Sequence, residues 1–424
     1  MLLERRPEIL AIDQKESEEY ADSFSGVAHL HAYQPPRQLI FNGKEIFNIT
    51  GQEKGKIGYN ERIWRESYKP IIESIAESPM VSFDFYGVLR DWVKVNHPED
   101  WSRLQFLVKG KSRDSVLGDP YLHPIFPLIP QSDRELLISI GKDAFYDDFG
   151  FYPKGLWLPE SAVNLETLED LKSSGIEFVL LRNDQLNLDK RISSALVKTN
   201  QGDIKVYIYN SDVSSRVAFG DIGNADTFAC DMKGRVFSRF AVDWETFGHH
   251  RGEGSLKFMD YLVNKSSVAK SVNSAVSESS HVKINPNSSW SCDHNLGRWT
   301  GDCCCDNASY QARNNKRELY RGLTNANEVV NKKLRKGLPN WKETFEDWFL
   351  DQRQNLASGK SVETSQIGRK YEKVFEAKFL YLVGMTSCSW FFGNDHAIER
   401  SIAENSLREI KEIFFSTNIF SDYS

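Results

Sequence analysis

The sequence predicts an α/β protein whose strands and helices alternate, followed by a helical C-terminal region. Short apolar runs recur along the first 263 residues. Between several of them, apolar positions repeat at three- and four-residue spacing, which is typical of amphipathic helices. After about residue 306, long stretches of helix-forming residues replace the strand-like runs. Alternating strands and helices favour a parallel sheet with helices outside it.

Six apolar runs are the predicted strands: Gly26–His31, Val81–Phe85, Leu156–Leu158, Ile176–Leu181, Ile204–Tyr209 and Val236–Val242. The clearest helices between them are Arg134–Tyr146 and Ala162–Ser173. Gly175 follows the second helix as a natural stop signal. The predicted C-terminal helices are Ala312–Lys336, Trp341–Ala357, Tyr371–Thr386 and Ala397–Ser416.

These patterns divide the chain into four predicted parts. Residues 1–22 form a charged N-terminal arm, and residues 23–263 form the domain of alternating strands and helices. Residues 264–306 combine a Ser-rich linker with a Cys-containing loop. Residues 307–424 form a helical C-terminal domain.

Composition excludes several classes of protein. The 424 residues include 53 basic and 59 acidic side chains, and the net charge of −6 argues against a nucleic-acid partner. No apolar run approaches the roughly 20 residues of a membrane span, so we expect no membrane partner. The first twenty residues lack the apolar core of a signal peptide, which predicts a cytoplasmic protein. The oligomeric state stays open.

Aromatic residues make up 12% of the chain, enough to pack a core or to line a sugar site.

Four of the six cysteines lie in one stretch, as Cys292 and the run Cys303–Cys305. Adjacent cysteines do not easily all reach disulfide geometry, so we expect reduced thiols. Cys292, His294, Cys303 and Cys305 are ligands of the type that zinc prefers, but their spacing matches no common zinc framework. The sequence therefore favours buried thiols that pack as small hydrophobes, and it predicts no bound metal or other cofactor.

Ionisable residues follow three of the predicted strands. In parallel α/β folds the reactive groups lie at the carboxyl ends of strands. His29 and His31 share one side of the first strand, Glu160 follows a short apolar strand, and Asp243 and Glu245 follow another. Three structural alternatives stay open: a pair of core histidines, a helix N-terminal charge at Glu160, and a salt-bridged strand end at Asp243.

Glu160 and Asp243 together suggest a specific chemistry. Two carboxyl groups from different strands that face one site meet the requirement of glycoside hydrolysis. One carboxylate attacks the anomeric carbon, and the other carboxylic acid protonates the departing oxygen.

The sequence resembles glycoside hydrolase family 57, and more narrowly a branch of that family with a Ser-Trp-Ser-Cys motif. Four stretches resemble conserved regions of the family, and two more match the branch. In chain order they are His31–Pro35, His123–Leu128, Gly155–Glu160, Val242–His249, Ser289–Cys303 and Thr386–Asp395. The resemblance rests on their number and order, which extend over most of the chain.

The resemblance implies a distorted (β/α)₇ barrel with a C-terminal helical domain and a retaining enzyme that acts on an α-glucan or maltooligosaccharide. Glu160 would be the nucleophile and Asp243 the general acid/base, with their carboxyl groups about 5–5.5 Å apart. Burial and the nearby Glu160 should raise the pKa of Asp243 and keep it protonated.

The resemblance also implies a set of substrate-binding residues. These are His31, His123, Trp157, Glu245, His249, Trp290, Arg298, Trp299, Trp390 and Asp395. Three of the tryptophans, at positions 290, 299 and 390, are candidate stacking surfaces for sugar rings, and Arg298 is a candidate polar clamp. Trp244 stands where relatives often have a small residue, which predicts a narrower site or an added stacking face.

Several alternatives remain at the level of function. Hydrolysis, glucan transfer and branching use the same two carboxyl groups, and amylase-type hydrolysis is our first choice. A second class is a metal-dependent hydrolase of a related seven-stranded barrel, of the α-mannosidase or deacetylase type. Its ligands would be His29, His31, Asp243 and His249. The third class is a non-catalytic glucan-binding protein.

Overall fold

The computed structural model describes most of the chain. The described residues are 28–52, 56–75, 78, 81–111, 113–188, 192–233, 239–265, 280–364, 371–393 and 397–416. The predicted N-terminal arm and residues 266–279 of the predicted linker lie outside these ranges.

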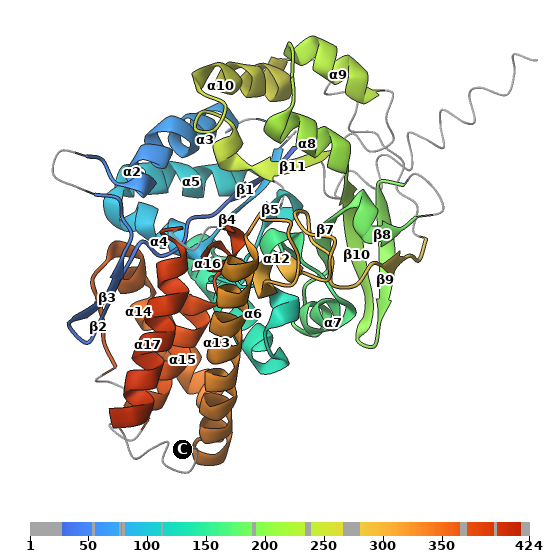
Figure 1. Ribbon diagram of the computed structural model, residues 1–424. Helices are drawn as coiled ribbons and strands as arrows, with labels where there is room; N and C mark the ends of the chain where they lie inside the picture. The colour runs from blue at the N-terminus through green and yellow to red at the C-terminus, as the bar shows by residue number, and fades with distance from the viewer. Residues whose placement is uncertain are drawn as a thin grey trace, which may run out of the picture.

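Seven parallel strands in the described part of the chain form a barrel and follow one another around it in chain order (Figure 1). They are β1 (Ala28–Ala32), β4 (Val81–Phe85), β5 (Val116–Leu117), β6 (Gly155–Leu156), β7 (Phe178–Arg182), β10 (Gly202–Tyr209) and β11 (Phe240–Asp243). One parallel ladder joins β11, β1, β4 and β5, and a second joins β6, β7 and β10.

Short contacts connect the two ladders. On one side Gly118 pairs with Leu156, and the Gly118 N–H donates to the Gly155 carbonyl at 2.9 Å. On the other side the Asn210 N–H donates to the Arg239 carbonyl at 2.9 Å. Because both connections are much shorter than a full strand pairing, the barrel is distorted. The predicted barrel class is confirmed.

Helices surround the barrel strands on the outside (Figure 1). They are α2 (Tyr59–Ile63), α3 (Lys69–Ile75), α4 (Gly87–Asn96), α5 (Pro98–Gly110), α6 (Gln131–Phe149), α7 (Leu165–Ser173), α8 (Ser211–Phe219), α9 (Ala225–Lys233) and α10 (Glu253–Asp260). Helix α7 begins later than predicted because the Asn164 side chain accepts the Thr167 N–H at 2.9 Å and caps it.

Alternation along the strands separates the outer core from the barrel interior. On β1, Ala28, Leu30 and Ala32 belong to the apolar core beneath the helices, whereas the residues between them are His29 and His31. Successive side chains point to opposite faces of a strand, so both histidines point into the barrel. The same rule directs Asp84 of β4 and Asp243 of β11 inward.

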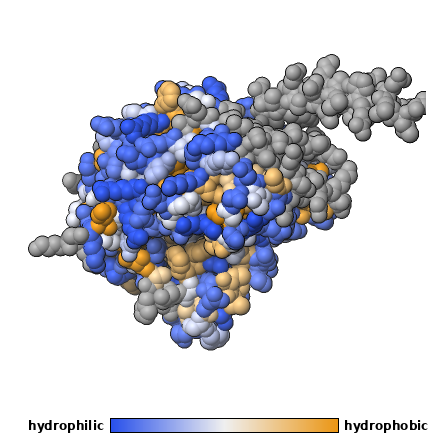
Figure 2. All heavy atoms as spheres, turned by 90° about the horizontal axis from the view of Figure 1, so that it is seen from above, coloured by the Kyte–Doolittle hydropathy of each residue, from blue (hydrophilic) through white to orange (hydrophobic). Residues whose placement is uncertain are grey.

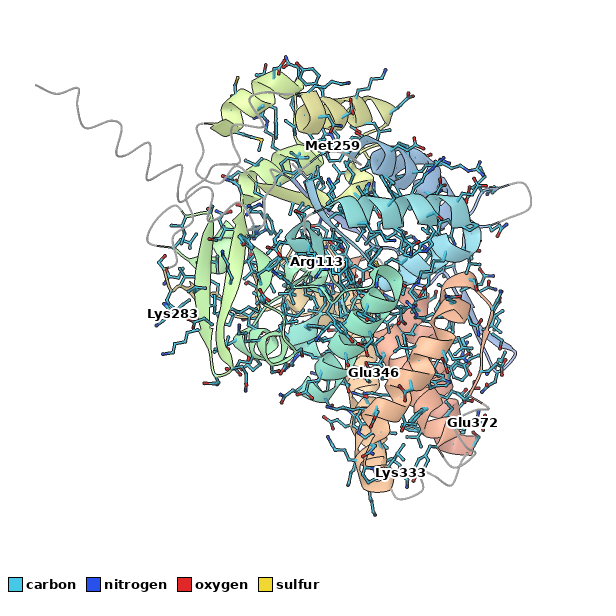
Figure 3. All side chains as sticks on the ribbon, turned by 180° about the vertical axis from the view of Figure 1, so that it is seen from behind. Arg113, Met259, Lys283, Lys333, Glu346 and Glu372 are labelled. Atoms are coloured by element: carbon cyan, nitrogen blue, oxygen red, sulfur yellow. The ribbon has the colours of Figure 1, made fainter. Side chains whose placement is uncertain are left out.

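The C-terminal region is a bundle of helices that lies beside the barrel (Figure 1). Its long helices are α13 (Tyr310–Gly337), α14 (Trp341–Ser358), α15 (Glu372–Gly384) and α17 (Arg400–Ser416), and its short ones are α12 (Gly297–Thr300) and α16 (Cys388–Phe391). Helix α15 is buried from Val374 to Gly384, with α13 and α17 against it, and α14 packs on α4 and α6 of the barrel. Figure 3 places Met259 of α10 and Lys333 of α13 at opposite ends of the molecule.

Small additional sheets complete the fold. The hairpin of β2 (Gln38–Phe41) and β3 (Lys44–Asn48) pairs with β13 (Ser361–Val362), so it joins the first barrel segment to the bundle. Strand β9 (Ser194–Thr199) extends β10, and β8 (Leu186–Asn187) pairs with β12 (Lys283–Ile284). Pairing through β12 places the chain after residue 280 on the barrel, and Lys283 lies at its outer edge in Figure 3.

The face that Figure 2 shows is largely hydrophilic, with apolar side chains interspersed. Among the described helices, none combines the length and the apolar character needed to cross a lipid bilayer.

A buried ion pair holds the bundle to the barrel. The Lys378 ammonium of α15 is fully buried, where it contacts Asp133 of α6. It also donates to the side-chain oxygens of Asn327 and Asn331 on α13, each at 2.9 Å. All three donor hydrogens of the ammonium therefore have partners, which offsets the cost of burying its charge.

Replacing Lys378 with Met should strongly destabilise the protein, because it leaves the buried Asp133 without its cation. We expect the free energy of unfolding to fall by about 3–5 kcal/mol, measured by denaturant titration. Lys342→Met is the control. Lys342 pairs with Glu135 at 2.5 Å, but both side chains are more than a third exposed, so the loss should stay within about 1 kcal/mol. Equal effects of the two substitutions would contradict this account.

Candidate active site

Three strands bring ionisable residues into one layer at the carboxyl end of the barrel. His31 of β1 lies opposite Asp84 of β4 on one side and opposite Asp243 of β11 on the other. Because side chains in register on neighbouring strands point to the same face, all three lie at the same depth inside the barrel. The structure thus joins residues that are more than 200 positions apart in the chain.

Asp84 orients both histidines of β1. Its Oδ1 lies 3.0 Å from His29 Nε2, and its Oδ2 lies 2.8 Å from His31 Nδ1. Burial lowers the pKa of His31 to about 4 and raises the pKa of Asp84 to about 7. His31 is therefore a neutral imidazole near neutral pH, with its ring orientation fixed by the carboxyl group. Asp84 was not predicted as a site residue, although a carboxylate within the apolar run Val81–Phe85 was a usable signal.

Glu160 lies in a strained turn just after β6. Glu160 and Ser161 both have left-handed backbones, with φ of 57° and 52°. Such conformations cost a non-glycine residue about 1–3 kcal/mol each and cluster at functional sites. Side chains from the turn after β7 and from β10 hold this turn. The Gln185 amide donates to the Ser161 carbonyl at 2.7 Å, and the Tyr209 hydroxyl lies 3.1 Å from Ser161 Oγ.

The Glu160 carboxyl group accepts hydrogen bonds from two distant segments. The Trp290 indole N–H donates to Oε2 at 2.7 Å, and the Ser291 hydroxyl lies 3.4 Å from the same oxygen. Ser387 Oγ lies 3.2 Å from Oε1. Burial raises the pKa of Glu160, and the hydrogen bonds from Trp290 and Ser387 act in the opposite direction. These donors stabilise the carboxylate form that a nucleophile needs.

Asp243 and Glu245 form the second acidic group. The side chain of Asp243 is exposed at the end of β11, yet the protein atoms around it raise its pKa to about 7, and repulsion from Glu245 and Glu160 adds to the shift. Glu245 is buried, and its Oε1 accepts hydrogen bonds from the Tyr68 hydroxyl and from the Gln34 amide, the latter at 2.6 Å.

His123 contacts both the barrel interior and the helical region. Its ring stacks on Tyr33 at 4.0 Å and on His31 at 5.1 Å between centroids. Its Nδ1 lies 2.6 Å from Ser387 Oγ, so Ser387 bridges His123 and Glu160. Burial lowers the pKa of His123 well below its usual range. Its Nε2 is buried and has no hydrogen-bond partner among the described residues.

The tryptophans predicted for the site have different positions. Trp157 is buried and stacks on His29 at 4.6 Å, and Trp290 is partly exposed and meets Trp157 edge to face at 5.3 Å. Trp299 and Trp390 are only 1% and 2% exposed and lie in the core shared with the bundle. Neither presents an open ring face, so the prediction that these two stack on sugar rings is wrong for this structure.

Trp244 also lies in the core. It is fully buried against Phe83, Phe85 and Tyr68 on the outer side of the barrel wall. Its side chain therefore neither narrows the site nor adds a stacking face, contrary to the expectation from the sequence. The alternation of β11 explains this result, because Asp243 points inward and the next residue does not.

Of three other predicted substrate-binding residues, two have hydrogen-bond partners other than the acids Glu160, Asp243 and Glu245, and one lies outside the described residues. Arg298 donates to the backbone carbonyls of Ser291, Phe391 and Cys305 at 3.2, 3.2 and 2.7 Å, and so ties the loop of Trp290 to the bundle. Its role as a substrate clamp stays a prediction. His249 Nδ1 lies 2.6 Å from Glu66 Oε2. Asp395 lies outside the described residues.

The ligand set considered for a metal-dependent hydrolase does not come together. His29 and His31 both bind Asp84, whereas His249 pairs with Glu66. Among the described residues, the donor atoms of His29, His31, Asp243 and His249 do not form a group close enough to share one ion. A different group does so, made by three cysteines and a histidine in the loop that follows Trp290.

Comparison with known proteins places the chain in a family. Residues 14–287, more than half of the chain, match the family model "Glycosyl hydrolase family 57". Alpha-amylase 1 of Dictyoglomus thermophilum is 28% identical over 199 residues, which are 44% of this chain and 29% of that protein. A 4-alpha-glucanotransferase of Thermococcus litoralis is 32% identical over 140 residues, which are 32% of this chain and 21% of that protein. The matched segments thus span less than a third of these relatives.

Solved structures extend the similarity over nearly the whole chain. An exo-type maltose-forming amylase from Pyrococcus sp. ST04 superimposes with a TM-score of 0.67 at 15% identity, over 94% of this chain and 82% of that one. The 4-alpha-glucanotransferase of Thermococcus litoralis gives 0.58 at 17% identity, over 93% and 60%. At these identities the structures show a shared fold. The family match over more than half of the sequence shows that the chain belongs to glycosyl hydrolase family 57.

Proposed function

We propose that the protein is a retaining glycoside hydrolase that acts on α-1,4-linked glucose polymers or maltooligosaccharides. The observation that carries the proposal is the pairing of two unlike carboxyl groups at one end of the barrel. Glu160 is held in a strained turn by donors that favour its charged form, whereas the pKa of Asp243 is raised to about 7. A carboxyl group whose charge is supported by hydrogen-bond donors suits a nucleophile, and a carboxyl group with a raised pKa suits an acid.

The proposed reaction is a double displacement. Glu160 attacks the anomeric carbon, and the glycosidic C–O bond breaks as Asp243 gives its proton to the departing oxygen. Asp243, now a carboxylate, takes a proton from water, and the water oxygen attacks the anomeric carbon and releases Glu160. The two carboxyl groups are expected to lie about 5–5.5 Å apart, the separation that allows direct attack.

The electrostatics suit both roles of Asp243. Repulsion from Glu160 contributes to its raised pKa. When Glu160 becomes a neutral glycosyl ester, that contribution disappears and the pKa of Asp243 falls. The same group is thus an acid in the first step and a base in the second. His31, His123 and Trp290 surround the acidic groups and are proposed to contact the sugar.

The substrate class is supported by the relatives, which include alpha-amylases and 4-alpha-glucanotransferases. Hydrolysis is our first proposal, ahead of glucan transfer or branching, which would use the same two carboxyl groups. Product analysis with maltooligosaccharides separates the three reactions. Reducing ends alone mean hydrolysis, longer and shorter α-1,4 chains mean transfer, and new α-1,6 links mean branching.

Glu160→Gln should abolish activity, because the amide keeps the shape of the carboxylate but cannot form the glycosyl ester. We expect kcat on maltooligosaccharides to fall on the order of 10³–10⁶-fold. Glu166→Gln, at an exposed position in the first turn of α7, is the control and should retain wild-type kcat. Wild-type turnover in the Glu160→Gln protein would show that Glu160 is not the nucleophile. A wild-type protein that binds glucans but does not cleave them would favour a binding protein.

The pH dependence should report the proton on Asp243. We expect kcat/KM to fall as the pH rises through about 7, because the acid loses the proton that it must donate. Glu245→Gln should move this alkaline limb to lower pH, since the negative charge of Glu245 helps to raise the pKa of Asp243.

Asp243→Asn completes the pH experiment. With an activated aryl glycoside, whose leaving group needs no proton, the variant should form the glycosyl-enzyme at rates that no longer fall above neutral pH. An alkaline limb that persists in this variant would show that another group supplies the proton.

Trp290→Phe tests the hydrogen bond to Glu160. Loss of a neutral donor to a carboxylate costs about 1.5–3 kcal/mol, so kcat should fall roughly 10–100-fold and the acidic limb of the pH profile should move to higher pH. Trp390→Phe is the matched control. Its indole donates to the Gly384 carbonyl at 3.1 Å inside the core, so its loss should affect stability and leave the acidic limb in place. Identical pH profiles for wild type and Trp290→Phe would show that the indole does not tune Glu160.

A further inference from the structure

The loop that follows Trp290 brings three thiols and an imidazole together. Cys292 Sγ lies 3.7 Å from Cys303 Sγ, and His294 Nδ1 lies 3.0 Å from Cys305 Sγ. All four donor atoms lie within 4.8 Å of one another. Cys292 and His294 lie at one end of a loop, and Cys303 and Cys305 lie at its other end. The loop folds back through the short helix α12.

The spacing of the Cys292 and Cys303 sulfurs suits zinc better than a disulfide. A tetrahedral zinc ion binds thiolates at about 2.3 Å, which places neighbouring sulfurs roughly 3.8 Å apart. The 3.7 Å between Cys292 and Cys303 agrees with that spacing. A disulfide requires about 2.05 Å, and all six cysteines are free thiols. Three cysteines with one histidine are also a recurrent structural zinc set.

We propose that Cys292, His294, Cys303 and Cys305 bind one zinc ion that has a structural role. Four protein ligands fill a tetrahedral shell and leave no open position for water or substrate. The sequence argument against zinc depended on linear spacing, whereas the structure brings the ligands together through the fold of the loop.

Groups around the cluster complement a bound ion. The Cys305 N–H donates to Cys303 Sγ at 3.5 Å, a contact of the kind that orients thiolate ligands. Three thiolates and one zinc ion carry a net charge of −1. Arg298 donates to the Cys305 carbonyl at 2.7 Å, so its positive charge lies beside the cluster and offsets that excess.

The ion would fix the turn that contacts Glu160. Cys292 follows Trp290 and Ser291 directly, and both of these side chains lie within hydrogen-bond distance of the Glu160 carboxyl group. The backbone of the turn is closed by Ser289, whose hydroxyl accepts the Cys292 N–H at 2.9 Å. Zinc at Cys292 therefore anchors one end of the turn, and the proposal does not depend on which reaction the carboxyl group performs.

Metal analysis of the full-length protein tests the site directly. After purification with a thiol reductant and without chelators, elemental analysis should find about one zinc per chain. His294→Ala and Cys303→Ser should each lose the zinc. Cys304→Ser is the matched control, because Cys304 is an exposed thiol of the same loop outside the cluster, and this variant should keep its zinc.

Two further measurements keep the test independent of folding and of activity. Cobalt(II) added to the zinc-depleted wild type should give the visible absorption of a tetrahedral thiolate site, and His294→Ala should weaken it. Chelation should also speed amide hydrogen exchange in residues 288–305 more than in α13.

Three results would overturn the proposal. The first is a reduced wild-type protein that neither contains zinc nor takes up zinc or cobalt. The second is a His294→Ala protein with wild-type zinc content. The third is a Cys292–Cys303 disulfide in the freshly purified protein, seen as a loss of two mass units, which would assign the pair a redox role.

Discussion

The hydrogen bonds to the Glu160 carboxyl group are the contacts on which the rest of the site depends. Glu160 itself belongs to the barrel, Trp290 to the loop after β12, and Ser387 to the segment that joins α15 and α16. One carboxylate of the barrel thus has hydrogen-bond partners from two other regions of the chain. Because its backbone is in a left-handed conformation, these partners also hold a turn that would otherwise relax.

Burial of ionisable groups is the second constraint on this fold. Desolvation by the surrounding protein pushes the acids and histidines at the strand ends toward their neutral forms. The pKa of Asp84, of Asp243 and of Glu245 is raised to about 7, and the pKa of His31 is lowered to about 4. The pKa of Glu160 is raised as well, but hydrogen bonds from Trp290 and Ser387 oppose this shift. The difference in hydrogen bonding distinguishes the two proposed catalytic acids.

Much of the barrel could be predicted from the sequence because its strands are local apolar runs. Val81–Phe85 is a strand with the predicted limits, and Glu160 and Asp243 lie just after predicted strands. Strand β5 escaped prediction because only Val116 and Leu117 pair in it, which is too short for a periodic pattern. Helix ends were shifted where a side chain such as that of Asn164 capped the backbone.

The errors within the site have a different physical origin. Ser387 contacts Glu160 across 227 positions, and spacing along the chain carries no information about such a contact. Trp299 and Trp390 were predicted as stacking surfaces, but residue type does not reveal which ring faces remain open after packing. The same holds for Cys292 and Cys303, whose approach depends on how the loop between them folds.

Ser387 also determines whether the barrel could function without the helical region. It is supplied by the helical region, yet it contacts both His123 and Glu160 of the barrel, and its backbone N–H donates to the His123 carbonyl at 2.6 Å. An isolated barrel would lack this residue and would expose the apolar surface that α14 now covers. Substitutions in the bundle that move the Ser387 hydroxyl group would therefore change the environment of Glu160. The barrel and the bundle must for this reason evolve as one unit.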